Sequence, residues 1–235
     1  MIIYGLHSCM AAIKSRPEKI RRLYLIDRKR NAETQELPKN LVQIADEQWF
    51  RKILPAGAIH QGIAIDIADF EYSDISELIS CPENCTVAML DGVTDPNNLG
   101  AIIRSAAAFG IYGIIISERS SCKITGVVAK ASSGGLEFIN LYVVKNLSQA
   151  IEMLKDYGFW IIAMTEKGSK SIQEIDSTGK NCVILGAEGA GIRRLQLEKS
   201  DIQARISTSP QFPTLNVSNA AAVIFSTFSQ TILCT

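Results

Sequence analysis

The stretch DGVTDPNNLGAIIR, residues 91–104, decides the fold because it joins an apolar strand to a helix through a polar turn. Pro96 has no backbone N–H and disfavours helical backbone at Asp95, so the turn is expected there. The short side-chain amide of Asn98 suits a helix N-cap. Further apolar residues recur at helical spacing and predict a buried stripe: Leu99, Ile102, Ile103, Ala106 and Phe109.

Arg104 is the cation of this expected helix. The residues one turn to either side of it are all small: Gly100, Ala101, Ala107 and Ala108. Small neighbours leave room for a bulky ligand beside the guanidinium. Because α/β proteins bind ligands beyond the carboxyl ends of parallel strands, the stretch predicts a ligand site at this strand end.

From residue 86 onward, short apolar segments alternate with helical patterns. The expected strands are 87–90, 113–117, 138–144, 160–164, 182–185 and 204–206. The expected helices are 98–109, 125–133, 148–157 and 217–230, and Gly110 and Gly158 stand where glycine caps end helices. Near-continuous apolar strands separated by helices predict an α/β fold whose parallel sheet is buried on both faces.

The N-terminal part has a different pattern. A helix is expected over 8–14, strands over 22–26 and 62–68, and a polar loop over 28–40. The segment that ends in Cys-Pro-Glu-Asn-Cys carries turn residues and is the expected boundary. We therefore divide the chain into an N-terminal domain (1–72), a linker (73–85) and a larger domain (86–235).

Composition narrows the protein class. The 235 residues are 47% hydrophobic and include no apolar run long enough for a membrane span, and the first residues lack the pattern of a signal peptide. We expect a cytoplasmic protein whose six cysteines are reduced thiols. Cys81 and Cys85 have the spacing of a ligand pair, but no second pair accompanies them, so no metal is expected.

The formal net charge is zero, which argues against indiscriminate coating of nucleic acid. The charge is uneven, however, because residues 14–30 hold eight Lys and Arg against Glu18 and Asp27. Taken alone, this run favours a solvated helix face over a phosphate-binding patch.

Three sequence blocks resemble the motifs of the SpoU (TrmH-type) RNA ribose 2′-O-methyltransferases of the SPOUT superfamily. The first is 91–104, the second is 184–192 (ILGAEGAGI), and the third is Ile206 followed by 214–221 (TLNVSNAA). The segments 3–7 and 60–64 resemble the edges of the small RNA-binding domain carried by the bacterial 23S ribosomal RNA guanosine members. The order of the blocks makes the resemblance specific, and it covers nearly the whole chain.

The resemblance implies a fold and a function. It implies a parallel-sheet SPOUT domain with a C-terminal trefoil knot, preceded by a small α/β (L30e-like) RNA-binding domain. The implied activity is methyl transfer from S-adenosyl-L-methionine to a ribose 2′-hydroxyl in structured RNA, most simply a guanosine of 23S ribosomal RNA. It also implies a homodimer packed through the SPOUT domain, with the last helix near the interface, and it favours a phosphate-contacting role for the basic run.

The resemblance also implies site residues. Gly186, Ile206 and Leu215 match positions that hold the cofactor, since glycine lets backbone approach a ligand and aliphatic side chains can enclose an adenine. Four further residues match catalytic or substrate-orienting positions: Asn98, Arg104, Glu188 and Asn216. A guanidinium stays protonated, so Arg104 is expected to clamp a phosphate or the 2′-oxyanion. Glu188 and Asn216 also suit helix caps.

The third block departs from the family pattern. Thr214 stands where the family has serine, Ser207-Thr208 replace Pro-Met, and Pro210 and Pro213 interrupt the loop. Thr214 keeps the hydroxyl and is retained as a catalytic candidate. These changes motivate an alternative, an RNA-binding homologue with weak or lost catalysis, and transfer RNA is an alternative substrate.

Two other interpretations remain. A nicotinamide dehydrogenase is disfavoured because residues 186–191 have the spacing Gly-x-x-Gly-x-Gly and come late in the domain. His7 and His60 lie in the N-terminal domain, far in sequence from the three blocks, and are expected to be structural or to face RNA.

Overall fold

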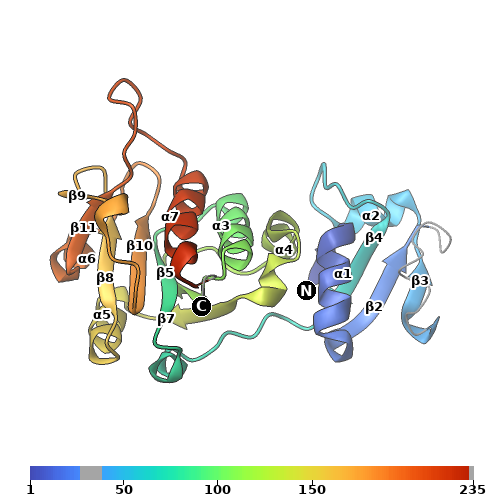
Figure 1. Cartoon of the computed structure of the whole chain (residues 1–235). Coiled ribbons are helices and arrows are strands. Elements are labelled where there is room, and N and C mark those ends of the chain that lie inside the picture. Colours follow the sequence, from blue (N-terminus) through green and yellow to red (C-terminus); the bar gives the residue numbers. More distant parts are fainter. Residues whose placement is uncertain (27–38, 233–235) are drawn as a thin grey trace.

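The computed structural model describes residues 1–26 and 39–232, which form two sheets side by side (Figure 1). The smaller sheet lies near the N-terminus and has the strand order β1-β4-β2-β3. The larger sheet has the order β7-β6-β5-β10-β8-β11-β9. The structure therefore has the two α/β units expected from the sequence; their residue limits stay a prediction.

The N-terminal sheet combines four short strands: β1 (Ile2–Tyr4), β2 (Ile20–Leu25), β3 (Val42–Ile44) and β4 (Ile63–Ile67). The helices around it are α1 (Leu6–Ser15), η1 (Pro17–Lys19), η3 (Lys39–Leu41) and α2 (Glu47–Ile53). The expected helix and both expected strands are confirmed within two residues. The short β1 and β3 and the helix α2 were not predicted, and most of the expected loop 28–40 lies outside the described residues.

The larger sheet is parallel at every strand pair. Its strands are β5 (Cys85–Asp91), β6 (Gly113–Ser117), β7 (Asn140–Val144), β8 (Trp160–Met164), β9 (Lys170–Ser171), β10 (Lys180–Gly186) and β11 (Ile202–Arg205). The helical segments are η4 (Ile75–Ser80), α3 (Pro96–Ala108), α4 (Gly126–Ser132), η5 (Gly135–Phe138), α5 (Leu147–Asp156), η6 (Ile172–Glu174), α6 (Arg194–Lys199) and α7 (Val217–Ile232).

Strands β5, β6, β7, β8 and β10 send alternate side chains to two cores. Ala88 and Leu90 of β5 pack with α3, α4 and α7, whereas Val87 and Met89 face α5 and η4. Figure 1 shows α7, α3, α4 and α1 following one another along one side. Burial on both faces explains why the strands are apolar throughout, as the sequence predicted.

Several element boundaries differ from expectation by one or two residues, and two of the differences have a clear physical cause. Asp95, rather than Asn98, caps α3: its carboxylate accepts from the Asn97 N–H at 2.8 Å, and Pro96 occupies the first helical position, where no N–H is needed. The expected strand 138–144 begins only at Asn140 because Phe138 closes the 3-10 turn η5. Gly110 and Gly158 both have positive φ, which confirms them as helix-ending glycines.

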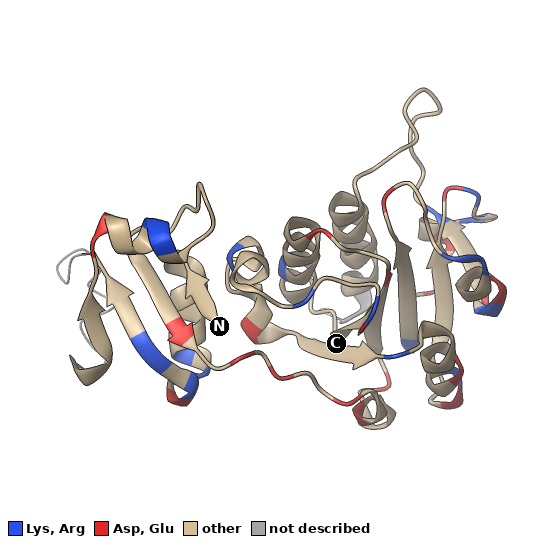
Figure 2. Cartoon of the chain, turned by 180° about the vertical axis from the view of Figure 1, so that it is seen from behind, with Lys and Arg blue, Asp and Glu red and all other residues tan. Residues whose placement is uncertain are grey.

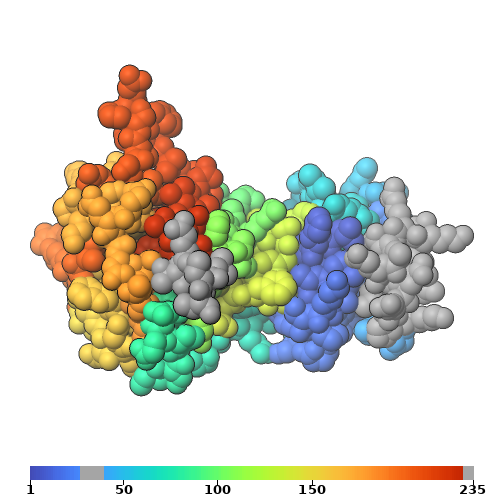
Figure 3. Space-filling view, in the orientation of Figure 1, coloured from blue at the N-terminus to red at the C-terminus, as the bar shows by residue number. Residues whose placement is uncertain are grey.

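The two units touch through α1 and β1 on one side and α4 and η5 on the other (Figure 3). Arg16 Nε and Nη2 donate to the two carboxylate oxygens of Glu137 at 2.7 and 2.6 Å, and Ser8 Oγ donates to the Ala129 carbonyl at 2.8 Å. The hydrophobic core around α3 continues without a break into α1 and β4. The two units therefore share a packed interface and are not connected by the linker alone.

The expected linker 73–85 is itself packed. Ser73 N–H donates to the Leu141 carbonyl of β7 at 2.9 Å, and Leu78 of η4 is fully buried. None of the helices within residues 1–26 and 39–232 combines the length and the apolar character needed to cross a bilayer. The trefoil knot stays a prediction from the resemblance.

Candidate functional site

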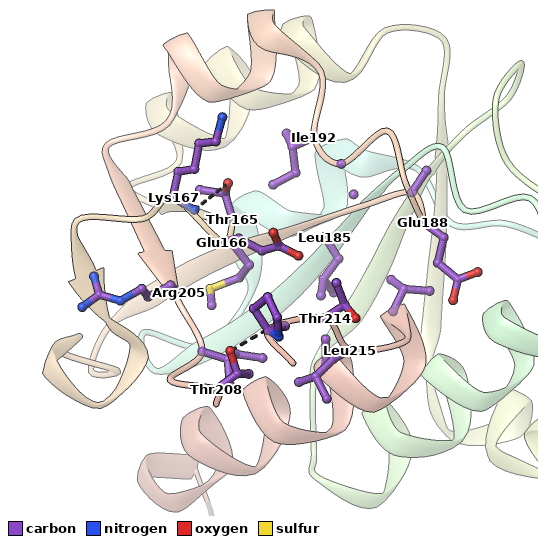
Figure 4. A pocket seen from close by; sticks show the side chains of 18 of the residues that line it. Thr165, Glu166, Lys167, Leu185, Glu188, Ile192, Arg205, Thr208, Thr214 and Leu215 are labelled. Carbon is purple, nitrogen blue, oxygen red and sulfur yellow. Dashed lines mark hydrogen bonds between the residues drawn. The ribbon is translucent and has the colours of Figure 1, made fainter. Parts of the chain in front are cut away.

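A cavity of about 1100 Å³ lies beyond the carboxyl ends of β8, β10 and β11, beside the start of α7. Met164, Gly186 and Ile206 reach it from these strand ends, and Val217 reaches it from the helix. Figure 4 shows the side chains that line it. Its volume suits an organic ligand of the size of a cofactor, and its position at the strand ends is where α/β sheets bind ligands.

The loop after β10 folds back on itself to form one wall. Gly191 N–H donates to the Ala187 carbonyl at 2.9 Å, and a Cβ on Gly186 would lie 2.2 Å from the Gly191 carbonyl carbon. Only glycine at 186 therefore permits the fold-back. The loop raises Glu188 at its outer end, where the side chain is exposed.

Asp91, the last residue of β5, holds the far end of this loop. Its fully buried carboxylate accepts from the Arg193 N–H at 2.9 Å, and the Arg193 Nε lies 3.4 Å from the other oxygen. Asp91 also pairs in register with Gly186. The first and second sequence blocks are therefore bonded to each other at the base of the cavity.

Asn216 joins all three blocks through one side-chain amide. Its Nδ2 donates to Glu188 Oε1 at 2.5 Å and to Asn98 Oδ1 at 3.1 Å. Its Oδ1 accepts from the Ser218 N–H at 2.8 Å, which caps α7 as the sequence predicted. Glu188 does not cap a helix, contrary to one of its expected roles, since α6 starts only at Arg194 and Arg193 is its N-cap.

The remaining expected cofactor residues, Ile206 and Leu215, line the same cavity together with Thr214. Leu215 is 44% exposed, so it is not core, which was the competing explanation for an aliphatic residue here. Figure 4 shows Leu215 and Thr208 on the α7 side of the cavity, where Thr208 Oγ1 donates to the Pro213 carbonyl at 3.2 Å.

Arg104 is not among the residues that line the cavity. It is exposed on α3, six residues after Asn98, and successive helix positions turn by about 100°, so the two side chains leave different faces. The small residues around it have a packing reason: a Cβ on Gly100 would lie 2.4 Å from the Ala131 Cβ of α4. The space that the sequence predicted for a ligand beside Arg104 is therefore occupied by α4 where α4 packs against Gly100.

Sequence reasoning missed the loop after β8. Thr165, Glu166 and Lys167 line the cavity, and Figure 4 shows the Glu166 side chain directed toward its middle. The Arg205 Nη1 donates to the Gly168 carbonyl at 2.6 Å and fixes this loop against β11. The signal available in the sequence was a polar run directly after an apolar strand, the same signal that marked residues 91–98.

No cysteine or histidine is among the described residues that line the cavity. Burial raises the pKa of the Cys9 and Cys182 thiols, which keeps them protonated, and Cys85 Sγ donates to Cys81 Sγ at 3.2 Å. Among residues 1–26 and 39–232, no cluster of three His, Cys, Asp or Glu side chains suits a metal ion. His60 stacks on Phe50 with ring centroids 4.3 Å apart, a structural role in the N-terminal unit.

The described basic residues of the run 14–30 fall into two groups, those that form ion pairs and those that do not. Figure 2 marks Lys and Arg in blue along the chain. Arg16 and Lys19 form ion pairs with Glu137 and Glu71. Lys14 and Arg22 are exposed on the N-terminal unit and have no ion pair among the described residues. Only part of the expected phosphate patch is therefore free to contact RNA, and residues 28–30 lie outside the described residues.

Two family profiles match this chain and together cover most of it. The SpoU rRNA Methylase family matches residues 86–226. The profile described as RNA 2′-O ribose methyltransferase substrate binding matches residues 2–73. Each profile corresponds to one of the two sheets.

Relatives match over nearly the full length. The chain is 36% identical over 233 residues to the 23S rRNA (guanosine-2′-O-)-methyltransferase RlmB of Coxiella burnetii, covering 94% of this chain and 92% of that protein. It is 29% identical to the RlmB of Escherichia coli K12, covering 94% and 95%. Among solved structures, the SpoU methyltransferase AviRb from Streptomyces viridochromogenes with AdoMet superposes with a TM-score of 0.84 at 19% identity, covering 100% of this chain and 91% of that one.

Proposed function

The chain belongs to the SpoU rRNA methylase family and is an RNA ribose 2′-O-methyltransferase; we propose that it methylates a guanosine of 23S ribosomal RNA. The observation that carries the proposal is that the second and third sequence blocks line one cavity and the first block is bonded to them at its edge through Asn98. Asn216 bonds both Glu188 and Asn98, and Gly186 and Leu215 line the same space. The cytoplasmic location expected from the sequence is part of the proposal and agrees with five described cysteines that form no disulfide.

The cavity has room for S-adenosylmethionine, and two carboxylates and two cations line it. The apolar side of the cavity, with Ile206 and Leu215, suits an adenine, and the Gly186 loop exposes backbone that a ligand can approach. Glu166 and Glu188 complement the cationic sulfonium and ammonium groups. When bound, the cofactor supplies an activated methyl group whose leaving group is a neutral thioether.

The protein's own residues then orient the ribose. The Glu188 carboxylate and the Asn98 amide are held by Asn216 at the mouth of the cavity, where a 2′-hydroxyl must approach. Fixing these groups lowers the entropy cost of bringing the hydroxyl in line with the methyl carbon. We assign the exposed guanidinium of Arg104 to a phosphate of the bound RNA or to the 2′-oxyanion.

A homodimer is part of the proposal. The support is the outer side of the α3–α7 pair: Arg104 is exposed on α3, and Val223 of α7 is an exposed apolar residue. A second copy packed there would cover Val223 and bring one protomer's α3 close to the other's substrate. Sedimentation equilibrium tests it: a monomer at micromolar concentration contradicts the dimer and leaves the methyl-transfer proposal standing.

The decisive experiment measures cofactor binding and methyl transfer together. Calorimetry with S-adenosylmethionine is followed by transfer of labelled methyl groups to unmodified 23S ribosomal RNA and, separately, to total transfer RNA. Label in a guanosine of 23S RNA supports the proposal. Label in transfer RNA alone would show that transfer RNA, and not 23S RNA, is the substrate. No cofactor binding at millimolar concentration favours the alternative, a binding homologue in which Ser207, Thr208 and Thr214 have weakened the adenine loop.

A further inference from the structure

Phe212 stands at the end of a structured turn beside the cavity. Ser209 and Phe212 form an isolated bridge, the Phe212 N–H donates to the Ser209 carbonyl at 3.1 Å, and Gln211 N–H donates to Ser209 Oγ at 3.3 Å. Pro210 and Pro213 limit the backbone on either side. The turn therefore presents Phe212 in a defined place.

Phe212 is 74% exposed as a residue, and none of the ring contacts among the described residues involves it. Figures 1 and 3 show the turn, at the orange-red end of the colour scale, standing clear of the rest of the surface. Its base is part of the cavity wall, since Thr208, Pro213 and Thr214 all line the cavity. The turn that carries Phe212 therefore rises from the edge of the cavity.

The residues next to Phe212 in sequence indicate which kind of ligand its ring can contact. Residues 206–216 include no charged side chain, so the turn does not attract phosphates. An exposed aromatic ring without charge offers a flat face, and RNA bases that are unpaired stack on such faces. On the N-terminal unit, the loop that carries Ile59, itself 72% exposed, projects to the same side of the molecule (Figures 1 and 2).

We propose that Phe212 stacks on an unpaired base of the RNA substrate, next to the nucleotide whose ribose enters the cavity. The inference rests on the proposed function, which places RNA at the cavity mouth. Stacking would hold the neighbouring base out of its helix and so position the target ribose. Phe212 thereby acts as a positioning residue for methyl transfer, outside the three sequence blocks that define the family resemblance.

The test compares four forms of the full-length protein: wild type, Phe212→Ala, Phe212→Trp and Phe212→Leu. Binding is measured on unmodified 23S ribosomal RNA transcribed in vitro, over a range of salt concentrations, and on single-stranded RNA oligonucleotides that contain 2-aminopurine, whose fluorescence falls when it stacks. Calorimetry with S-adenosylmethionine and methyl transfer to the 23S transcript complete the set.

Loss of one base–aromatic stack predicts about 5- to 150-fold weaker RNA binding for Phe212→Ala. Phe212→Trp should restore binding and 2-aminopurine quenching, whereas Phe212→Leu, which keeps apolar bulk but no ring, should restore neither. The slope of log affinity against log salt should stay at the wild-type value, because no phosphate contact is lost. Cofactor affinity should also stay at the wild-type value.

Three results would overturn the inference. RNA binding by Phe212→Ala equal to wild type removes the stacking role. A loss of cofactor affinity in that variant assigns the ring to the cofactor, and a change of oligomeric state in sedimentation assigns it to contact with a second copy. If wild type binds 2-aminopurine RNA through Phe212 but transfers no methyl group, the proposed function fails while the stacking inference stands.

Discussion

At the residue scale, the side-chain amide of Asn216 both caps a helix and contacts two other site candidates. The Oδ1 of Asn216 caps α7, while its Nδ2 donates to Glu188 and Asn98. The helix-cap interpretation of Asn216 is therefore confirmed, while its catalytic or orienting role stays a proposal. One side chain makes both sets of contacts because a carboxamide oxygen accepts hydrogen bonds and its nitrogen donates them.

The proposed role of Arg104 in methyl transfer can be tested by substitution. We expect Arg104→Ala to abolish methyl transfer while the S-adenosylmethionine dissociation constant changes by less than about tenfold, or roughly 1.4 kcal/mol, because the guanidinium does not line the cavity. Calorimetry and single-turnover transfer measure the two effects. Arg194→Ala is the matched control, since that side chain is 90% exposed on α6. Turnover at the wild-type rate in Arg104→Ala would remove this residue from the mechanism.

At the element scale, strand β5 and the Gly186 loop depend on a buried carboxylate. Replacing Asp91 by Ala leaves the Arg193 N–H without its acceptor, and an unsatisfied buried donor costs about 1–3 kcal/mol. We expect Asp91→Ala to weaken S-adenosylmethionine binding about tenfold or more, measured by calorimetry, and Asp91→Asn, which keeps an acceptor, to restore part of it.

The control for the Asp91 variants removes a carboxylate from the surface. Glu198 pairs with Arg194 on exposed α6, so Glu198→Ala should leave cofactor binding unchanged. Equal cofactor affinity in Asp91→Ala and wild type would show that the loop holds its shape without the buried bond.

Helix packing gives a second prediction at this scale. A Cβ at position 100 would lie 2.4 Å from Ala131 Cβ and 2.8 Å from the Val128 carbonyl oxygen, so Gly100→Ala forces α3 and α4 apart. We expect a loss of about 1–3 kcal/mol in the free energy of unfolding, measured with denaturant. Adding Ala131→Gly should recover part of the loss. An unchanged unfolding curve for Gly100→Ala would mean that small residues there serve a ligand after all.

At the scale of the whole molecule, the buried pair between Arg16 and Glu137 fixes one unit against the other. The Glu137 side chain is 4% exposed, and Arg16 also lies over the Phe70 ring, 5.5 Å from its centroid. Removing one member of a buried pair leaves an uncompensated charge. The distance between the RNA-binding unit and the cavity therefore depends on this contact.

We expect Glu137→Gln to lower the free energy of unfolding by about 3 kcal/mol and to raise the KM for 23S RNA, with cofactor affinity unchanged. The double variant Arg16→Met with Glu137→Leu should recover stability, since apolar replacements of both members avoid the buried charge. Denaturant unfolding and steady-state kinetics measure these effects. If the double variant recovers stability but its KM for 23S RNA stays high, Arg16 itself contacts the RNA.

The sequence by itself determined the parallel sheet, most of its helices and the residues of the three blocks. These follow from local rules: strands 113–117 and 160–164 agree with β6 and β8 to the residue, because short continuous apolar runs and the glycines that end helices are signals within a few neighbouring residues. Short elements such as β3 and α6 carry too few residues for a periodic signal.

Only the tertiary structure decided which of those residues meet. It brought Asn98, Glu188 and Asn216 together, turned Arg104 to another side of α3, filled the space at Gly100 with α4, and added the loop of Glu166 to the cavity. It also paired Arg16 with Glu137 across 121 positions of the chain. The physical reason is that packing and ion pairing depend on distances in space between segments remote in sequence, which no local pattern encodes.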